Sequence, residues 1–221
     1  MEIANQIFNW LSLVTIIISF VISKIHQSRK NLFPIQLYII VSIIANLIFN
    51  IFDVLPFKSS YKNIEQVSFN IYSLLEISLI YYFLFISIKG KGFRTTMLIS
   101  LFIFLSICIV GWTLSSTLFF SFAPDLSGTE GLLITIACLF YIYEILKSDL
   151  NIDLKSDANF IATCGILFYF SMSIPTYFSW FNLHYLAPGF QKIIILTNSL
   201  FYTILFISFM KAFICPIPNQ K

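Results

Sequence analysis

Seven long apolar segments, separated by short connectors, constrain this chain more than any other feature of its sequence. A helix that crosses a bilayer needs about 20 mostly apolar residues. The runs are continuous and do not alternate in polarity as the strands of an outer-membrane barrel do, so helices are predicted. The predicted fold is an all-α, seven-transmembrane helix bundle that forms a single domain over residues 1–221. Its spans are Ile7–Ser23, Leu32–Phe52, Ile64–Ile88, Thr95–Ser116, Gly131–Ser148, Phe160–Phe181 and Lys192–Cys215.

The composition explains why a membrane is needed. Only 10% of the 221 residues are charged and 58% are hydrophobic, whereas about 25% of a soluble domain is charged. Such a chain cannot cover a surface that faces water, so membrane lipids are its expected surroundings. The first segment is expected to remain as a span, because Lys24 follows the apolar run and no basic residue precedes it as in a signal peptide.

The basic residues predict the orientation. With seven spans, ten of the 13 Lys and Arg residues fall on one side and three on the other. Cytoplasmic connectors carry the excess of Lys and Arg, so the N-terminus is predicted outside and the C-terminus inside. The inner residues are Lys24, Arg29, Lys30, Lys89, Lys91, Arg94, Lys147, Lys155, Lys211 and Lys221, and the outer ones are Lys58, Lys62 and Lys192.

Glu76 is the most informative single residue. It lies at the middle of the third span between Leu75 and Ile77, where a carboxylate costs about 2.5–3.5 kcal/mol on insertion scales. It must therefore face the bundle interior, paired or protonated. Helical spacing places Glu65, Tyr72 and Glu76 on one stripe. Ligand binding, proton coupling, ion coordination and a purely structural hydrogen bond between helices all fit this position.

Two other spans carry polar residues at helical spacing. Ser42, Asn46, Asn50 and Asp53 follow one face of the second span, from mid-membrane to its outer end, and Asn198 and Tyr202 are one turn apart in the seventh. Side chains of this kind in apolar surroundings must find partners. They serve either as polar contacts between helices or as one wall of a pocket that opens outward.

The connectors divide into two kinds. The segments Thr117–Glu130 and Asn182–Gln191 are expected on the outer side, and both are rich in apolar residues. They fit either aromatic anchoring at the interface or a lid over an outer pocket. On the inner side, Glu144 precedes Lys147 by three residues, which fits an ion pair. An inner gate or a contact with a partner protein is the alternative role for Glu144.

Several chemistries lack their sequence signals. The chain has no G-x-S-x-G, H-E-x-x-H, S-x-x-K or Walker motif. Its two histidines, His26 and His184, are predicted on opposite sides of the membrane, so no metal site is expected between them. No cofactor and no nucleic-acid partner is expected, because basic residues are not grouped with aromatic ones on a soluble face.

Parts of the chain resemble a known group of proteins. The sequences Asn70-Ile-Tyr-Ser-Leu-Leu-Glu76, Tyr141-Ile-Tyr-Glu144, Gly165-Ile-Leu-Phe-Tyr169 and Ile174-Pro175 resemble a family of small, uncharacterised bacterial seven-helix membrane proteins. The resemblance implies a location in the bacterial inner membrane and brings no activity. The bundle is also similar to the seven-helix sensory regions of bacterial signalling kinases, although here no cytoplasmic output domain is expected.

Polar stripes that open outward favour a receptor-like or sensory bundle. It would bind a small amphipathic or lipid-like ligand from the outer side and act through a membrane or cytoplasmic protein partner. A proton-coupled transporter or channel subunit that uses Glu76 is one alternative, and a structural accessory subunit of a membrane complex is another. An enzyme is not expected. An intramembrane lipid enzyme using Glu76, Asp53 or Glu65 is least favoured, since no nucleophile motif or histidine lies near these acids.

Overall fold

The computed structural model describes residues 2–26, 30–54, 58–114, 124–148, 154–178 and 188–216. Within these ranges the chain forms seven α-helices and one short 3-10 helix, with no strand, so the all-α prediction is confirmed. The α-helices are α1 (Glu2–Ile25), α2 (Phe33–Val54), α3 (Lys58–Ser87), α4 (Lys91–Leu114), α6 (Pro124–Lys147), α7 (Ala158–Phe178) and α8 (Pro188–Ile214), and η1 (Lys30–Leu32) precedes α2.

Six of the helices, α2, α3, α4, α6, α7 and α8, are long and apolar enough to cross a membrane. The apolar stretch of α1, Trp10–Ile25, is shorter. A hydrocarbon core of about 30 Å can be spanned by about 20 helical residues. The protein is therefore a multi-pass membrane protein.

Two helices begin well before the apolar runs that predicted them. Helix α3 starts at Lys58 although its apolar run starts at Ile64, because backbone hydrogen bonding continues into the polar flank. Helix α6 starts at Pro124, so the predicted outer connector Thr117–Glu130 is too long and Glu130 lies inside a helix. Proline suits the first helical position, since its fixed φ is already helical and no N–H is lost there.

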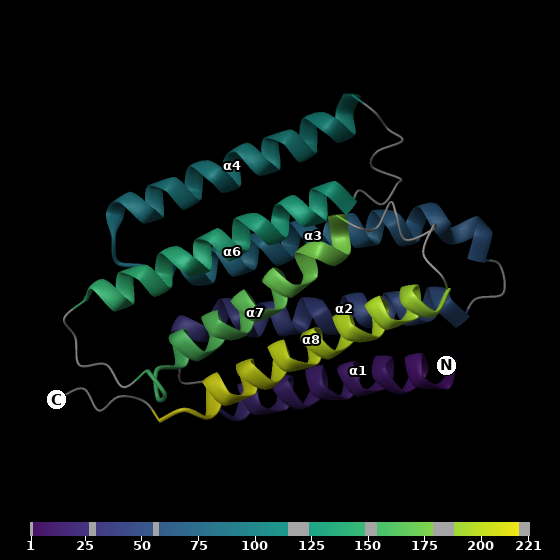
Figure 1. Ribbon diagram of the computed structural model, residues 1–221, viewed down its shortest axis with the longest axis horizontal. Helices are drawn as coiled ribbons and strands as arrows, with labels where there is room; N and C mark the ends of the chain where they lie inside the picture. Colours follow the sequence, from purple (N-terminus) through teal and green to yellow (C-terminus); the bar gives the residue numbers. More distant parts are fainter. Residues whose placement is uncertain are drawn as a thin grey trace.

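Consecutive helices run in opposite directions along one long axis (Figure 1). We call the end of the bundle where α1 begins the N-end, and the end where α8 finishes the C-end. Helix α8 packs against α1 and α7, α7 also packs against α6, and α2 packs against α3. The largest fully buried side chains include Tyr38, Phe83, Phe206 and Phe209. These four side chains come from α2, α3 and α8, and the buried core that contains them receives residues from all seven α-helices.

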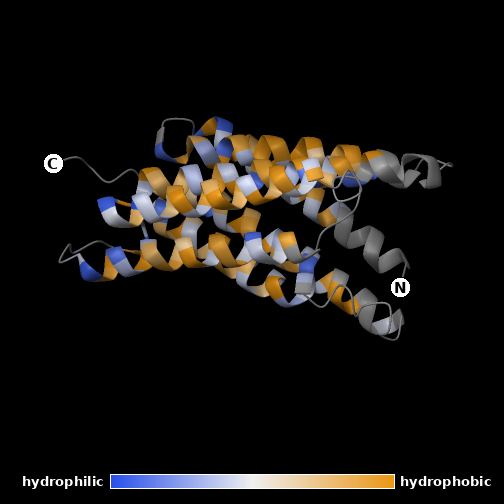
Figure 2. Cartoon of the chain, turned by 90° about the horizontal axis from the view of Figure 1, so that it is seen from above, coloured by the Kyte–Doolittle hydropathy of each residue, from blue (hydrophilic) through white to orange (hydrophobic). Residues whose placement is uncertain are grey.

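Hydrophobic residues follow the helices through their middle lengths, and the most hydrophilic residues gather at the C-end (Figure 2). Helix α4 is the most peripheral element. It packs against α3 and α6, only 17% of its apolar stretch is buried, and Phe102 and Leu114 are among its most exposed residues. In a bilayer this outward face of α4 contacts lipid.

A glycine allows a close approach between α7 and α8. A Cβ atom added at Gly165 of α7 would lie 2.5 Å from Cβ of Ser208 of α8. Small residues at such crossings let the backbones of membrane helices come together. Gly165 therefore fixes how tightly α7 and α8 pack. By contrast, a Cβ added at Gly111 of α4 would meet no atom within 4 Å.

Replacing Gly165 by alanine should destabilise the protein. We expect Gly165→Ala to lower the free energy of unfolding by about 1–3 kcal/mol, because the added methyl group overpacks a tight crossing. Gly111→Ala is the matched control and should be neutral or slightly stabilising, because alanine is the better helix former. Denaturant unfolding in mixed micelles measures both. Equal effects of the two substitutions would show that the α7–α8 crossing is not tight.

Candidate functional site

Glu76 lies in the interior of the bundle, as predicted for a carboxyl group at mid-membrane. Its side chain is 6% exposed and sits at the middle of the apolar stretch Gln66–Ser87 of α3. Tyr38 of α2 donates its hydroxyl proton to Glu76 Oε1 at an O···O distance of 2.6 Å. Hydrogen bonds to a carboxylate are short and strong. This contact therefore ties α2 to α3 in the middle of the membrane.

Tyr72, one turn before Glu76, is the centre of a hydroxyl network. Its hydroxyl oxygen lies 3.3 Å from Glu76 Oε1 and 3.3 Å from the hydroxyl of Tyr38. It also lies 3.3 Å from Ser42 Oγ and 3.3 Å from the hydroxyl of Tyr202. A phenol has one proton and two lone pairs. Tyr72 therefore has more partners than it can satisfy at once, and its hydrogen bonds can be exchanged among them.

The stripe on α2 and the pair on α8 meet at this network. Asn46 Nδ2 donates to the backbone carbonyl of Ser42 at 2.8 Å and reaches the hydroxyl of Tyr202 at 3.4 Å. Asn198, one turn before Tyr202, accepts a hydrogen bond from Ser173 Oγ of α7 at 2.8 Å. Four helices, α2, α3, α7 and α8, are thereby joined through polar side chains.

A cavity of about 210 Å³ lies beside the network. Among the predicted residues, Glu76, Tyr72, Asn46, Asn198 and Tyr202 all line it. Its wall comes from α1, α2, α3, α7 and α8, in the half of the bundle toward the N-end. We call it the Glu76 cavity. The remaining lining residues are Ser12, Ala45, Phe49, Phe69, Tyr169, Tyr177 and Ser199.

An aromatic cluster lies on the C-end side of the cavity and meets it through Tyr202. The ring of Tyr38 stacks on Phe206 with centroids 6.0 Å apart and meets Phe209 edge-on. Tyr202 in turn packs edge-on against Phe206 at 4.9 Å. Such offset and edge contacts are the favoured arrangements of aromatic pairs. This cluster forms an apolar floor under the polar network.

A second carboxyl group lies near the first. Glu130 of α6 is 3% exposed, and its Oε2 accepts a hydrogen bond from Ser73 of α3. Its Oε1 is buried and has no hydrogen-bond partner in the described part of the chain. Glu130 is close enough to Glu76 for the two carboxyl groups to interact electrostatically, and Tyr177 interacts with both.

Some predicted residues stand apart from the cavity. Asn50 Nδ2 donates to the backbone carbonyl of Asn46 at 2.8 Å, so this amide satisfies itself within α2. The side chains of Asp53 and Glu65 lie outside the described part of the structure, although their backbones belong to α2 and α3. The predicted stripe therefore contributes to the cavity through Asn46.

Glu144 belongs to the C-end and has a structural contact. Its Oε1 accepts the backbone N–H groups of Lys89 and Gly90, each at 2.8 Å, just before α4 begins. A carboxylate is favourable at a helix N-terminus. The ammonium group of Lys147 lies 6.0 Å from the ring centroid of Tyr143. Glu144 thus anchors the start of α4 to α6.

Sequence reasoning missed two partners that helical spacing could have found. Tyr38 lies one turn before Ser42, so it extends the polar stripe of α2 back toward the membrane centre. Glu130 was assigned to a connector, yet Pro124 is a helix-start signal that places it in the second turn of α6. Tyr169 gives no such signal, because an aromatic residue in an apolar run is usual.

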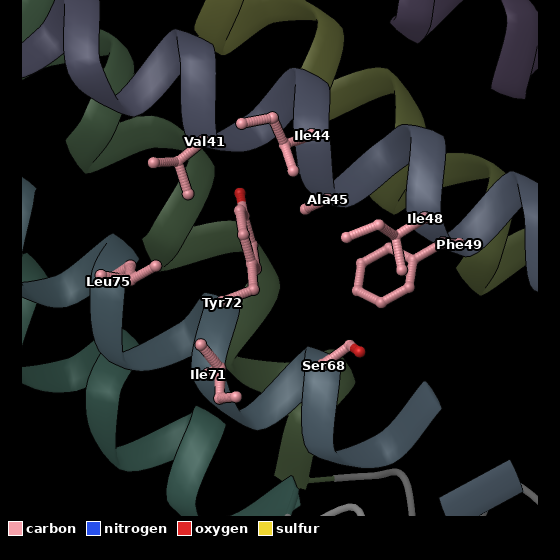
Figure 3. Close-up of a pocket in the computed structure, with 9 residues that line it drawn as sticks. All are labelled: Val41, Ile44, Ala45, Ile48, Phe49, Ser68, Ile71, Tyr72 and Leu75. Carbon is pink, nitrogen blue, oxygen red and sulfur yellow. The ribbon is translucent and has the colours of Figure 1, made fainter. Parts of the chain in front are cut away.

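An apolar groove adjoins the Glu76 cavity between α2 and α3 (Figure 3). It has a volume of about 250 Å³ and shares Ala45, Phe49 and Tyr72 with the cavity. Tyr72 extends from α3 toward α2 (Figure 3) and lines both spaces. The other lining residues of the groove are Val41, Ile44, Ile48, Ser68, Ile71 and Leu75. We call it the α2–α3 groove.

Comparisons with known proteins assign no function to this arrangement. No protein family, curated protein or solved structure matches the chain. Within the described residues, no group of three or more His, Cys, Asp or Glu side chains is placed to hold a metal ion. The cavity and its neighbouring groove are therefore the features of the molecule that point to a function.

Removing the Tyr38 hydroxyl should weaken the structure measurably. We expect Tyr38→Phe to lower the free energy of unfolding by about 1–3 kcal/mol, because a buried carboxyl oxygen loses its donor. Tyr82→Phe changes an exposed tyrosine of the same helix as Glu76 and should stay within about 0.5 kcal/mol of wild type. Denaturant unfolding in mixed micelles compares the two. A Tyr38→Phe protein as stable as Tyr82→Phe would mean that the Tyr38–Glu76 bond adds nothing to stability.

Proposed function

We propose that this protein is a receptor-like, seven-span membrane protein that binds a small amphipathic ligand in the Glu76 cavity. The observation that carries the proposal is the adjacency of two unlike spaces. A polar cavity inside the bundle shares Ala45, Phe49 and Tyr72 with an apolar groove between α2 and α3. Ligand sites in general are apolar hollows with a few converging polar groups. Here the polar groups line the cavity and the apolar surface lines the neighbouring groove. This arrangement suits an amphipathic molecule, which has one polar and one apolar part.

The size of the two spaces supports a shared occupant. Ligand pockets usually measure about 300–1,000 Å³. The cavity of about 210 Å³ and the groove of about 250 Å³ each fall below that range. Taken as one site they reach it. A head group in the cavity and a tail in the groove would therefore use both.

The topology in this proposal has seven spans, with the N-end outside. Helix α1 has 24 residues, which is about 36 Å at 1.5 Å per residue, and it packs against α2 and α8 like its neighbours. The described basic side chains Lys89, Arg94, Lys147 and Lys211 belong to the C-end, which favours that end as cytoplasmic. The Glu76 cavity would then lie in the outer half of a bacterial inner membrane protein.

A receptor of this form must pass the effect of ligand binding to another protein. The C-end would meet a membrane or cytoplasmic protein partner, and a ligand would act by changing how α2 and α3 pack. A ligand shifts a conformational equilibrium only through its differential affinity for the two states. Tyr72 contacts α2, α3 and α8 through its exchangeable hydrogen bonds. Its rearrangement on binding is the change that we propose.

A cavity-filling substitution should abolish ligand-dependent stabilisation. The probes are decyl amphiphiles with trimethylammonium, hydroxyl or sulfonate head groups, added to the protein in nanodiscs. We expect at least one probe to raise the thermal unfolding temperature of wild type, because a ligand at 100 times its Kd adds about 2.7 kcal/mol.

Phe49→Trp, which fills the wall shared by cavity and groove, should lose this response. Phe102→Trp, on the outward face of α4, should keep it. The absence of a response to every probe, or an equal response in the Phe49→Trp protein, would overturn the proposed binding function.

A second function is favoured by the two buried carboxyl groups. Among the described residues, Glu76 is hydrogen-bonded to tyrosine hydroxyls and Glu130 to a serine hydroxyl, and neither carboxyl group pairs with a basic side chain. Both carboxyl groups are buried inside the bundle, at 6% and 3% exposed. Ionisable groups at this depth commonly serve proton pathways. This pair fits proton-coupled transport.

A measurement of proton flux tests whether the protein is a proton-coupled transporter. Reconstituted vesicles under a pH gradient should then acidify faster than protein-free vesicles, and Glu76→Gln should abolish the difference because the amide cannot release a proton. Glu144→Gln, at the far end of the bundle, should retain flux. No flux above protein-free vesicles would exclude proton transport by the chain alone.

A further inference from the structure

The charge and lining of the Glu76 cavity define a class of ligand. Among the described residues that line it there is one carboxyl group, that of Glu76, and no Lys, Arg or His. Glu130 adds a second buried carboxyl group close by, and its Oε1 has no hydrogen-bond partner in the described part of the chain. A buried carboxylate without a counter-charge is costly. The region therefore favours positive charge.

The aromatic residues that line the Glu76 cavity also favour a positively charged ligand. Four tyrosines and two phenylalanines line the cavity. Ring faces attract cations, and aromatic cages with a nearby carboxylate suit quaternary ammonium groups in particular. Phosphate and carboxylate head groups would face Glu76 with no cation to pair with. The lining residues are Tyr72, Tyr169, Tyr177, Tyr202, Phe49 and Phe69.

The second compartment determines the rest of the ligand. The α2–α3 groove is lined by aliphatic side chains, and Ile44, Ile71 and Leu75 are each about half exposed on the outside of the bundle. In a membrane this groove lies beside the lipid tails. An alkyl chain can reach it from the bilayer without crossing water, and Tyr72, which extends toward α2 (Figure 3), lines both the groove and the cavity.

From these observations we infer that the Glu76 cavity takes the ammonium head of a single-chain cationic amphiphile whose alkyl chain lies in the α2–α3 groove. Glu76 neutralises the head and the tyrosine rings surround it. Entry is lateral, between α2 and α3, with the hydroxyl of Tyr72 moving from one of its partners to another as the head passes. This inference rests on the proposed binding function and specifies the substrate class of the same site.

The head group is tested first, with wild type in nanodiscs. Decyltrimethylammonium should bind about tenfold or more tightly than decanol and than decyl sulfonate, the combined effect expected of a charge pair and ring contacts. Equal affinity for decanol would overturn the ammonium class and leave the proposed binding function standing. If none of the three probes binds, both the ammonium class and the proposed binding function are overturned.

The Glu76→Gln variant then tests whether the negative charge of Glu76 contributes to the preference for an ammonium head group. The amide keeps an oxygen for the Tyr38 hydroxyl and loses the negative charge, so the preference for decyltrimethylammonium over decanol should shrink to the part that the aromatic rings supply. Glu144→Gln, at the C-end, should bind both probes as wild type does. An ammonium preference as large in Glu76→Gln as in wild type would overturn the role of Glu76. If that variant does not fold, the comparison of head groups in wild type still decides the class.

The groove is tested separately. Leu75→Trp fills the groove from the lipid side and should weaken decyltrimethylammonium about tenfold. It should affect tetramethylammonium, which has no chain, by less than about twofold. Leu98→Trp is the matched control, because Leu98 is an exposed leucine of α4 away from the site. Unchanged binding of the decyl probe to Leu75→Trp would show that the chain lies elsewhere.

Discussion

The hydrogen bond from Tyr38 to Glu76 is the contact on which the interior of this bundle depends. A carboxyl group in the middle of a membrane must have a partner, and here a phenol from the neighbouring helix supplies it at 2.6 Å. Because α2 and α3 are held together at that depth, the residues on either side of the contact have fixed neighbours. Toward the C-end these are the rings of Phe206 and Phe209, and toward the N-end they form the Glu76 cavity.

The sequence predicts the helices and the position of Glu76 well, because both follow from what a bilayer excludes. Long apolar runs must be helical, and a mid-span acid must face inward. Helix ends are less well predicted: hydropathy marks where the membrane stops, whereas α3 and α6 continue into polar residues. That is why Glu130 was placed in a connector.

The composition of the cavity is only partly readable from the chain. Asn46, Asn198 and Tyr202 are recognisable, since polar groups at helical spacing stand out against aliphatic neighbours. Tyr169 and Phe69 do not stand out, because which face of α7 or α3 an aromatic residue occupies depends on packing between helices. The pairing of a polar cavity with an apolar groove depends on how α1, α2, α3, α7 and α8 pack together, so it cannot be read from any one segment of the sequence.

The near-contact at Gly165 has a mechanical meaning. With 2.5 Å between a hypothetical Cβ and Ser208, α7 and α8 leave no room for a molecule between them at this crossing. The α2–α3 boundary is joined by the Tyr38–Glu76 hydrogen bond, yet beside that bond it holds a groove of about 250 Å³. A guest molecule in that groove would therefore leave the α7–α8 crossing undisturbed.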